Sequence, residues 1–175
     1  MIKPWKIISR EEVFKKYSRK IDKLIVELHD GTSTDFYVKN EGPAAAVLAI
    51  TNDGNILLTR QYRLGPNEVL DELPGGFVDD GESGLEAMKR ELIEETGYDG
   101  ELEFVGTCFD DAYSTMLRYC YVAKNCVKIG EPQNTQTEQI QVVTKTIMEF
   151  RELLRSGKMT DIEVGYLCLD YLQLL

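Results

Sequence analysis

Residues 75–98, which read GGFVDDGESGLEAMKRELIEETGY, constrain the fold more than any other stretch of this chain. Ser83 and Glu86 have the spacing of a capping box, and Gly97 is the residue type that favours a left-handed conformation just beyond a helix. We therefore predict a loop followed by a helix that spans about residues 84–96.

The predicted helix carries one apolar stripe. Leu85, Met88 and Leu92 recur at helical spacing, and Ala87 and Ile93 lie at the margin of the stripe. We expect this stripe to face the core.

Three glutamates gather near the end of the predicted helix. Glu91, Glu94 and Glu95 stand at i, i+3 and i+4, where their like charges repel and oppose the helix dipole. One interpretation is a solvated acidic face. The other is a divalent-cation site, because carboxylate oxygens suit Mg²⁺ and Mn²⁺. Gly75 and Gly76 favour the second interpretation, since glycine lets the backbone approach a ligand closely.

A longer pattern runs through the same segment. It has the form G-x5-E-x7-R-E-U-x-E-E-x-G-U, where U is a bulky apolar residue, and every specified position is filled. The positions are Gly76, Glu82, Arg90, Glu91, Leu92, Glu94, Glu95, Gly97 and Tyr98. The chain therefore resembles the Nudix hydrolases, and so many fixed positions make a chance match improbable. The resemblance implies hydrolysis of a nucleoside diphosphate linked to another moiety, with divalent metal held by the glutamates.

The resemblance extends to segments on both sides of this pattern. Residues 61–63 (QYR) and 72–76 (ELPGG) resemble the equivalent segments of Nudix enzymes that cleave ADP-ribose and related nucleoside diphosphate sugars. The substrate contacts that the resemblance implies are Arg63, Glu72 and Gly76. The metal ligands that it implies are Glu91, Glu95, Glu94 and the Gly75 carbonyl. A surface ion pair is the alternative role for Arg63.

A catalytic base is also implied by the resemblance. In similar enzymes it is a glutamate on a loop before a late strand, and here residues 130–139 (GEPQNTQTEQ) form the matching polar loop. We predict Glu138, which occupies the family position, with Glu131 as the alternative. Glu94 and Arg90 are the further catalytic candidates. A solubilising role at a strand edge is the other interpretation of Glu138.

One segment departs from the subgroup. ADP-ribose pyrophosphatases usually carry Ser-Pro-Gly after the glutamate motif, whereas residues 110–114 read DDAYS here. Tyr113 and Ser114 in this segment are the candidates for substrate contact. The preferred sugar nucleotide therefore stays open, with ADP-ribose as the first choice.

The order of predicted elements defines the fold class. Residues 1–42 are rich in β-type sequence around an Asp30-Gly31 turn and are too few to fold alone, so they form an appendage. Residues 43–175 alternate strands and helices, which predicts an α/β/α sandwich with a mixed sheet, as the Nudix resemblance also implies. In resembling enzymes such an N-terminal segment joins two subunits, so we expect a homodimer.

Composition excludes several classes of function. A net charge of −10 over 175 residues argues against a broad nucleic-acid or anionic-membrane surface. No apolar run is long enough to span a bilayer, and nothing resembles a signal peptide, so a cytoplasmic location is expected. The four cysteines lack CxxC spacing and the single histidine, His29, lies beside the turn, so neither a zinc site nor histidine catalysis is expected.

Taken with the resemblance, these features predict a pyrophosphohydrolase of nucleoside diphosphate sugars that depends on Mg²⁺, with Mn²⁺ as the substitute ion. Its products would be a nucleoside monophosphate and a sugar phosphate. Two alternatives are a nucleoside triphosphate pyrophosphohydrolase and a Nudix-like sensor that binds such ligands without cleaving them.

Overall fold

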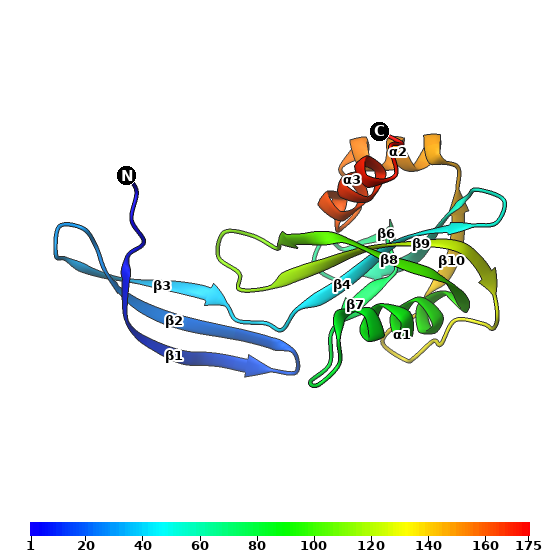
Figure 1. Cartoon of the computed structure of the whole chain (residues 1–175). Helices are drawn as coiled ribbons and strands as arrows, with labels where there is room; N and C mark the ends of the chain where they lie inside the picture. The colour runs from blue at the N-terminus through cyan, green and yellow to red at the C-terminus, as the bar shows by residue number, and fades with distance from the viewer. The chain divides into compact units, whose positions relative to one another are not determined.

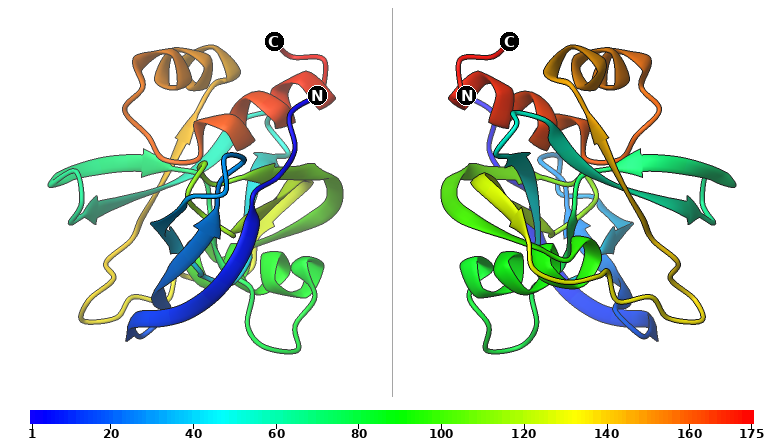
Figure 2. Two further views of the ribbon diagram at one scale, coloured as in Figure 1. Left: turned by 90° about the vertical axis from the view of Figure 1, so that its left-hand side faces the viewer. Right: turned by 90° about the vertical axis from the view of Figure 1, so that its right-hand side faces the viewer.

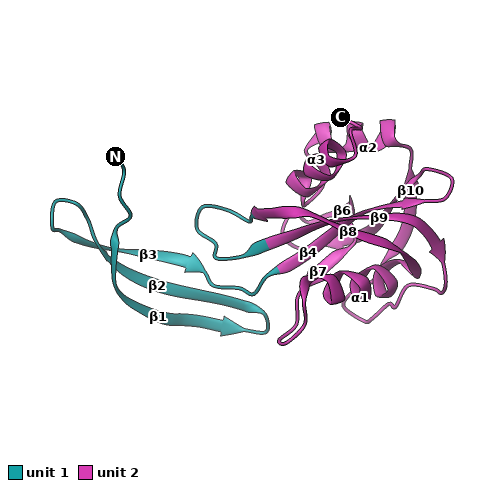
Figure 3. Ribbon diagram, in the orientation of Figure 1, with its two compact units in different colours: residues 1–43, 109–117 teal, residues 44–108, 118–175 magenta.

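The chain divides into two compact units in the computed structural model, which describes residues 1–175 (Figure 3). Unit 1 comprises residues 1–43 and 109–117, and unit 2 comprises residues 44–108 and 118–175. The first unit therefore includes a loop that lies far along the chain from the N-terminal segment.

Unit 1 is built on a three-stranded antiparallel sheet with the order β1-β2-β3 (Figure 1). Its strands are β1 (Lys6–Lys16), β2 (Arg19–Glu27) and β3 (Ser33–Lys39). The turn between β2 and β3 lies where the sequence predicts it, with Gly31 at φ 83°. Leu24 and Val26 of β2 are buried, whereas every residue of β1 is exposed.

The distant loop of residues 109–117 is held to the end of β3. The Lys39 N–H donates to the Tyr113 carbonyl at 2.8 Å, and the Thr115 N–H donates to the Lys39 carbonyl at 2.9 Å. The Lys39 ammonium also forms ion pairs with Asp110 and Asp111. These contacts join two stretches that are about 70 residues apart in sequence.

Unit 2 contains a seven-stranded mixed sheet with the order β10-β5-β4-β9-β8, in which β6 pairs with β5 and β7 with β4. Its strands are β4 (Ala44–Thr51), β5 (Ile56–Arg63), β6 (Glu68–Glu72), β7 (Gly75–Phe77), β8 (Tyr98–Phe109), β9 (Leu117–Lys128) and β10 (Gln141–Lys145). The sheet is mixed because β4 and β9 run parallel while β4 and β5 run antiparallel. β4 is almost wholly apolar and buried, as expected for a strand covered on both faces.

Helices cover both faces of this sheet (Figure 2). α1 (Gly84–Thr96) lies on one face, where Met88 and Leu92 join one core cluster. α2 (Ile147–Ser156) and α3 (Ile162–Tyr171) lie on the other, where Phe150 and Val164 join a second cluster. The predicted α/β/α sandwich with a mixed sheet is therefore confirmed. None of the three helices combines the length and the hydrophobicity that a bilayer-spanning helix requires.

The two ends of α1 form as predicted. The Ser83 hydroxyl accepts from the Glu86 N–H at 3.2 Å while the Ser83 N–H donates to the Glu86 carboxylate at 2.8 Å, and Gly97 closes the helix at φ 72°. The predicted apolar stripe is only partly right. Leu85 is 50% exposed, because the buried face is centred on Met88, Leu92 and the acidic Glu95. A glutamate thus takes a place in the buried face of this helix.

Candidate active site

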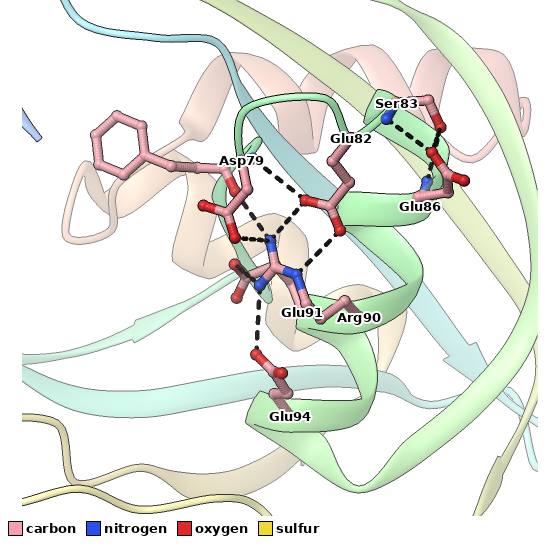
Figure 4. Close-up of polar contacts among 8 residues, drawn as sticks. Asp79, Glu82, Ser83, Glu86, Arg90, Glu91 and Glu94 are labelled. Carbon is pink, nitrogen blue, oxygen red and sulfur yellow. Dashed lines mark hydrogen bonds and ion pairs between the residues drawn. The ribbon is translucent and has the colours of Figure 1, made fainter.

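Arg90 is the centre of a polar network in the middle of α1 (Figure 4). Its Nε and Nη2 donate to the two Glu82 carboxylate oxygens at 3.0 and 2.9 Å, and Nη2 also donates to the Phe77 carbonyl at 3.2 Å. Its Nη1 donates to Glu91 at 2.7 Å and to Glu94 at 3.3 Å. The hydrogen bonds to Glu82 raise the Arg90 pKa further above its ordinary value. One guanidinium therefore fastens the preceding loop to the helix and holds two of the predicted metal carboxylates.

Glu95 is held from the side of β7. Its Oε2 accepts a hydrogen bond from the Gly75 N–H at 2.8 Å, and the residue is only 6% exposed. Burial raises the pKa of Glu95 to about 8, and the nearby charges of Glu91 and Glu138 add to the rise. Burial also raises the pKa of Glu91, although Arg90 opposes that rise. Glu91 and Glu95 therefore bring negative charges close together, and the positive charge of Arg90 neutralises them only in part.

The two glycines of β7 are needed for close packing. Gly75 and Gly76 pair with Ala46 and Ala45 of β4. A Cβ atom at Gly75 would overlap the Ala45 carbonyl, and one at Gly76 would overlap the Glu91 carboxylate. Glycine at position 75 thus lets β7 lie close to β4, and glycine at position 76 lets β7 lie directly against Glu91 of α1.

The donor set fits a divalent cation in its chemistry, because hard ions prefer carboxylate and carbonyl oxygens. No group of three or more His, Cys, Asp or Glu side chains is arranged here to hold a metal ion. Glu91 instead faces Arg90, and Glu95 accepts from the Gly75 N–H. The Gly75 group in contact with Glu95 is thus its N–H, and a ligand role for its carbonyl remains a prediction.

Arg63, the last residue of β5, forms an ion pair with Glu72, the last residue of the neighbouring strand β6. The Arg63 Nε and Nη2 both lie 2.7 Å from the Glu72 Oε2, and the Glu72 side chain is 1% exposed. The other oxygen of Glu72, Oε1, is buried without a hydrogen-bond partner. The positive charge of Arg63 opposes the rise in the Glu95 pKa. Arg63 therefore does make an ion pair, but with a buried carboxylate, and its side chain remains 40% exposed.

The structure separates the two candidates for the base. Glu138 lies in the loop between β9 and β10, and its charge adds to the raised pKa of both Glu91 and Glu95. Glu131 lies at the start of that loop and pairs with Lys128 at 2.6 Å. Glu131 thus has an ion-pair partner of its own, and the role of Glu138 as the base remains a prediction.

Tyr113 and Ser114 belong to unit 1. The Tyr113 ring stacks on Phe36 with a centroid distance of 6.4 Å, and Phe36 stacks on Trp5 at 5.4 Å. The Ser114 hydroxyl accepts from the Met116 N–H at 3.2 Å. Both residues have defined contacts within their unit, and their role as substrate contacts remains a prediction from the resemblance.

Several contacts in the site are not evident from sequence spacing. Glu82 is the main partner of Arg90 although the two are eight residues apart, a separation that does not place residues together on a helix. The family pattern contains both positions and is the one sequence signal for this pair. The Gln133 N–H donates to the Glu94 carbonyl at 2.7 Å, and a backbone contact of this kind leaves no side-chain signature.

Acidic side chains on α1, a glycine strand against them and the Arg63–Glu72 pair, within an α/β/α sandwich, have the chemistry that suits a divalent cation and an anionic substrate. The NUDIX domain model matches residues 40–166. The chain belongs to the Nudix family, and it is a hydrolase that acts on phosphoric anhydrides.

Two curated relatives match nearly the whole chain. The ADP-ribose pyrophosphatase of Bacillus subtilis (strain 168) is 27% identical over 174 residues, which is 97% of this chain and 92% of the relative. A methanol dehydrogenase activator of Bacillus methanolicus is 27% identical over 172 residues, again 97% of this chain and 92% of the relative. A solved crystal structure of an ADP compounds hydrolase superposes with a TM-score of 0.78 at 19% identity, covering 100% of this chain and 99% of that one. The match to the ADP compounds hydrolase structure shows that the two proteins share a fold.

Proposed function

We propose that this protein is a Mg²⁺-dependent pyrophosphohydrolase of nucleoside diphosphate sugars, with ADP-ribose as the first substrate and Mn²⁺ as a substitute ion. The observation that carries the proposal is the Arg63–Glu72 pair, together with the partly exposed Glu91 and the buried Glu95 on α1. Binding of a diphosphate requires positive charge, which Arg63 supplies. The hydroxyl groups of a sugar nucleotide can donate to a carboxylate oxygen without another partner, such as Glu72 Oε1. The relative named as an ADP-ribose pyrophosphatase, which aligns over 97% of the chain, supports the choice of substrate.

The residues take the following roles in this proposal. Glu91 and Glu95, with Glu94 and the Gly75 carbonyl, would hold the divalent ion, which would neutralise diphosphate charge and orient the attacking water. Arg90 keeps Glu91 and Glu94 in place.

The remaining site residues contact the substrate and the water. Arg63 offers its exposed guanidinium to a phosphate, while the unpartnered Oε1 of Glu72 accepts a hydrogen bond from the substrate. Gly76 lets the substrate approach the β7 backbone, and Tyr113 and Ser114 are further substrate contacts. Glu138 removes the proton from the attacking water. Water is added across the P–O–P linkage, which yields a nucleoside monophosphate and a sugar phosphate.

A turnover panel tests the substrate. ADP-ribose, other nucleoside diphosphate sugars and the common nucleoside triphosphates would be incubated with Mg²⁺ and, separately, Mn²⁺, and the products resolved by chromatography. We expect ADP-ribose or another nucleotide sugar to be cleaved fastest, with a monophosphate among the products. Triphosphate turnover far above every nucleotide sugar, with release of pyrophosphate, would contradict the proposal. Binding without cleavage of any compound would indicate a sensor instead.

We also propose that unit 1, the N-terminal segment with its distant loop, joins two copies into a homodimer. β1 is an edge strand of the unit 1 sheet and is exposed along its whole length. Its exposed residues include Ile7, Val13 and Phe14, each at least 45% accessible. An unpaired edge with apolar side chains favours association with another chain.

Light scattering at micromolar concentration tests the dimer. We expect the wild-type chain to show twice its monomer mass of 19.9 kDa, and we expect Phe14→Lys to shift the population toward monomer because it places a charge on the exposed edge strand. Met148→Lys, which changes an exposed apolar residue of α2 in unit 2, is the matched control and should leave the mass unchanged. A wild-type protein that is monomeric under these conditions would rule the dimer out.

A further inference from the structure

The loop that carries Glu138 is tied to the helix that carries the acidic residues. The Ile129 and Gly130 N–H groups donate to the Gly97 carbonyl at 2.8 and 3.0 Å, immediately beyond the end of α1. Further along, the Gln133 N–H donates to the Glu94 carbonyl at 2.7 Å. The first half of the loop is therefore fixed to α1 by three backbone hydrogen bonds.

The second half of the loop closes on itself around Thr135. The Thr135 N–H donates to the Glu138 carbonyl at 2.8 Å, and the Thr135 hydroxyl accepts from the Glu138 N–H at 3.0 Å. The Asn134 side-chain oxygen accepts from the Ile140 N–H at 2.6 Å and closes the base of the loop. One residue thus engages both backbone polar groups of Glu138.

The Glu138 side chain is left free by this arrangement. Its carboxylate makes no hydrogen bond or ion pair within the chain, while its backbone is held on both sides. A base needs this combination, because it must accept a proton from water and yet lie at a defined place. The loop that carries this carboxylate is held to α1 by the hydrogen bond from the Gln133 N–H to the Glu94 carbonyl.

We propose that Thr135 is the positioning residue for Glu138, and that its hydroxyl fixes the Glu138 backbone so that the carboxylate faces the attacking water. This inference rests on the proposed function, because it assumes that Glu138 is the base. Thr135 touches neither substrate nor water in this scheme and acts only through Glu138.

Substitutions that keep or remove the hydroxyl separate this role from simple loop stability. Thr135→Val preserves the shape of the side chain but removes the acceptor for the Glu138 N–H, whereas Thr135→Ser keeps the acceptor. The matched control is Thr137→Val, because the one hydrogen bond of the Thr137 hydroxyl is a 3.5 Å contact with Thr135.

The kinetic measurements would use whichever compound the panel shows to be cleaved fastest. We expect Thr135→Val to lower kcat by roughly 10- to 100-fold with little change in KM, since a misplacement of about 1 Å can cost about 100-fold. Thr135→Ser and Thr137→Val should stay within a few-fold of wild type. A drop in Thr135→Ser equal to that in Thr135→Val would overturn the role of the hydroxyl.

The double variant Thr135→Val/Glu138→Gln decides whether Thr135 acts through Glu138. We expect it to be no slower than Glu138→Gln alone, because a misplaced base costs nothing once the base is gone. Additive losses would overturn the inference. Near-normal activity of Thr135→Val beside a crippled Glu138→Gln would also overturn it and leave the proposed function intact. If Glu138→Gln itself were fully active, both the base and its positioning residue would be misassigned, whereas a triphosphate as best substrate would contradict only the proposed substrate.

Discussion

Glu91→Gln and Glu95→Gln are each expected to lower metal-dependent turnover by at least about 1000-fold. Each substitution would remove one charged ligand from the proposed metal site, where a bound ion would contribute several kcal/mol to the transition state, and about 4 kcal/mol corresponds to about 1000-fold. The fold should remain, because both side chains lie on a capped helix whose apolar contacts are unchanged. Turnover with Mg²⁺, together with calorimetric titration of the ion, measures both effects.

The matched control is Glu152→Gln, which removes the same charge from an exposed position on α2. It should match wild type in activity and in metal affinity. The metal assignment fails if Glu91→Gln or Glu95→Gln retains near-normal Mg²⁺-dependent activity, or if the wild-type protein binds no divalent ion.

Glu95→Gln should also stabilise the metal-free protein, and by an amount that depends on pH. The pKa of Glu95 is raised to about 8 from an ordinary 4.5, because burial disfavours the charged form. Below pH 4.5 the group is protonated in both folded and unfolded chains, so the substitution gains little. Between pH 4.5 and about pH 8, Glu95 is ionised in the unfolded chain but stays largely protonated in the folded chain. The wild type therefore loses stability as pH rises through this range. The gain in Tm of the variant, measured in chelator, should therefore grow from about pH 4.5 to about pH 8 and then level. A gain that shrinks over this range would contradict the burial of a charged Glu95.

Glu138→Gln is expected to lower kcat by about 10²–10⁴-fold, the usual contribution of a general base. Glutamine keeps the size of the side chain but cannot take a proton. Metal affinity should hardly change, because Glu138 lies on the loop and is not among the predicted metal ligands. Single-turnover kinetics with Mg²⁺ would show the loss in the chemical step, and calorimetry would show that the ion still binds.

Glu131→Gln is the control on the same loop. Its side chain pairs with Lys128 and is 79% exposed, so the variant should keep nearly normal kcat. The opposite pattern, with a crippled Glu131→Gln and an active Glu138→Gln, would move the base to Glu131. If both variants were active, Glu94 would be the next candidate, since its side chain is 40% exposed beside Arg90.

Local contacts explain most of what could be predicted. The capping box of Ser83 and Glu86 and the left-handed Gly97 need only neighbours within a few residues, so the ends of α1 follow from the sequence. Which face of α1 is buried does not follow from the sequence in the same way. Leu85 has the expected spacing but is exposed, because the sheet and β7 bury Glu95 on the adjacent part of the helix. Helical periodicity favours apolar residues in the core and cannot identify a functional carboxylate there.

The sequence by itself determined the family pattern, the three glutamates on one helix and the order of strands and helices, because these depend on fixed spacings along the chain. Only the tertiary structure decided which groups meet. It joined Arg90 to Glu82, set Arg63 against the buried Glu72 and separated Glu138 from the ion-paired Glu131.

The tertiary structure also assigned residues 109–117 to unit 1. It placed Thr135 in hydrogen bonds with both the N–H and the carbonyl of Glu138. Contacts of this kind link residues that are distant along the chain, or are made by backbone atoms that every residue carries. Their partners are fixed by the packing of the folded chain and leave no periodic signal in the order of side chains.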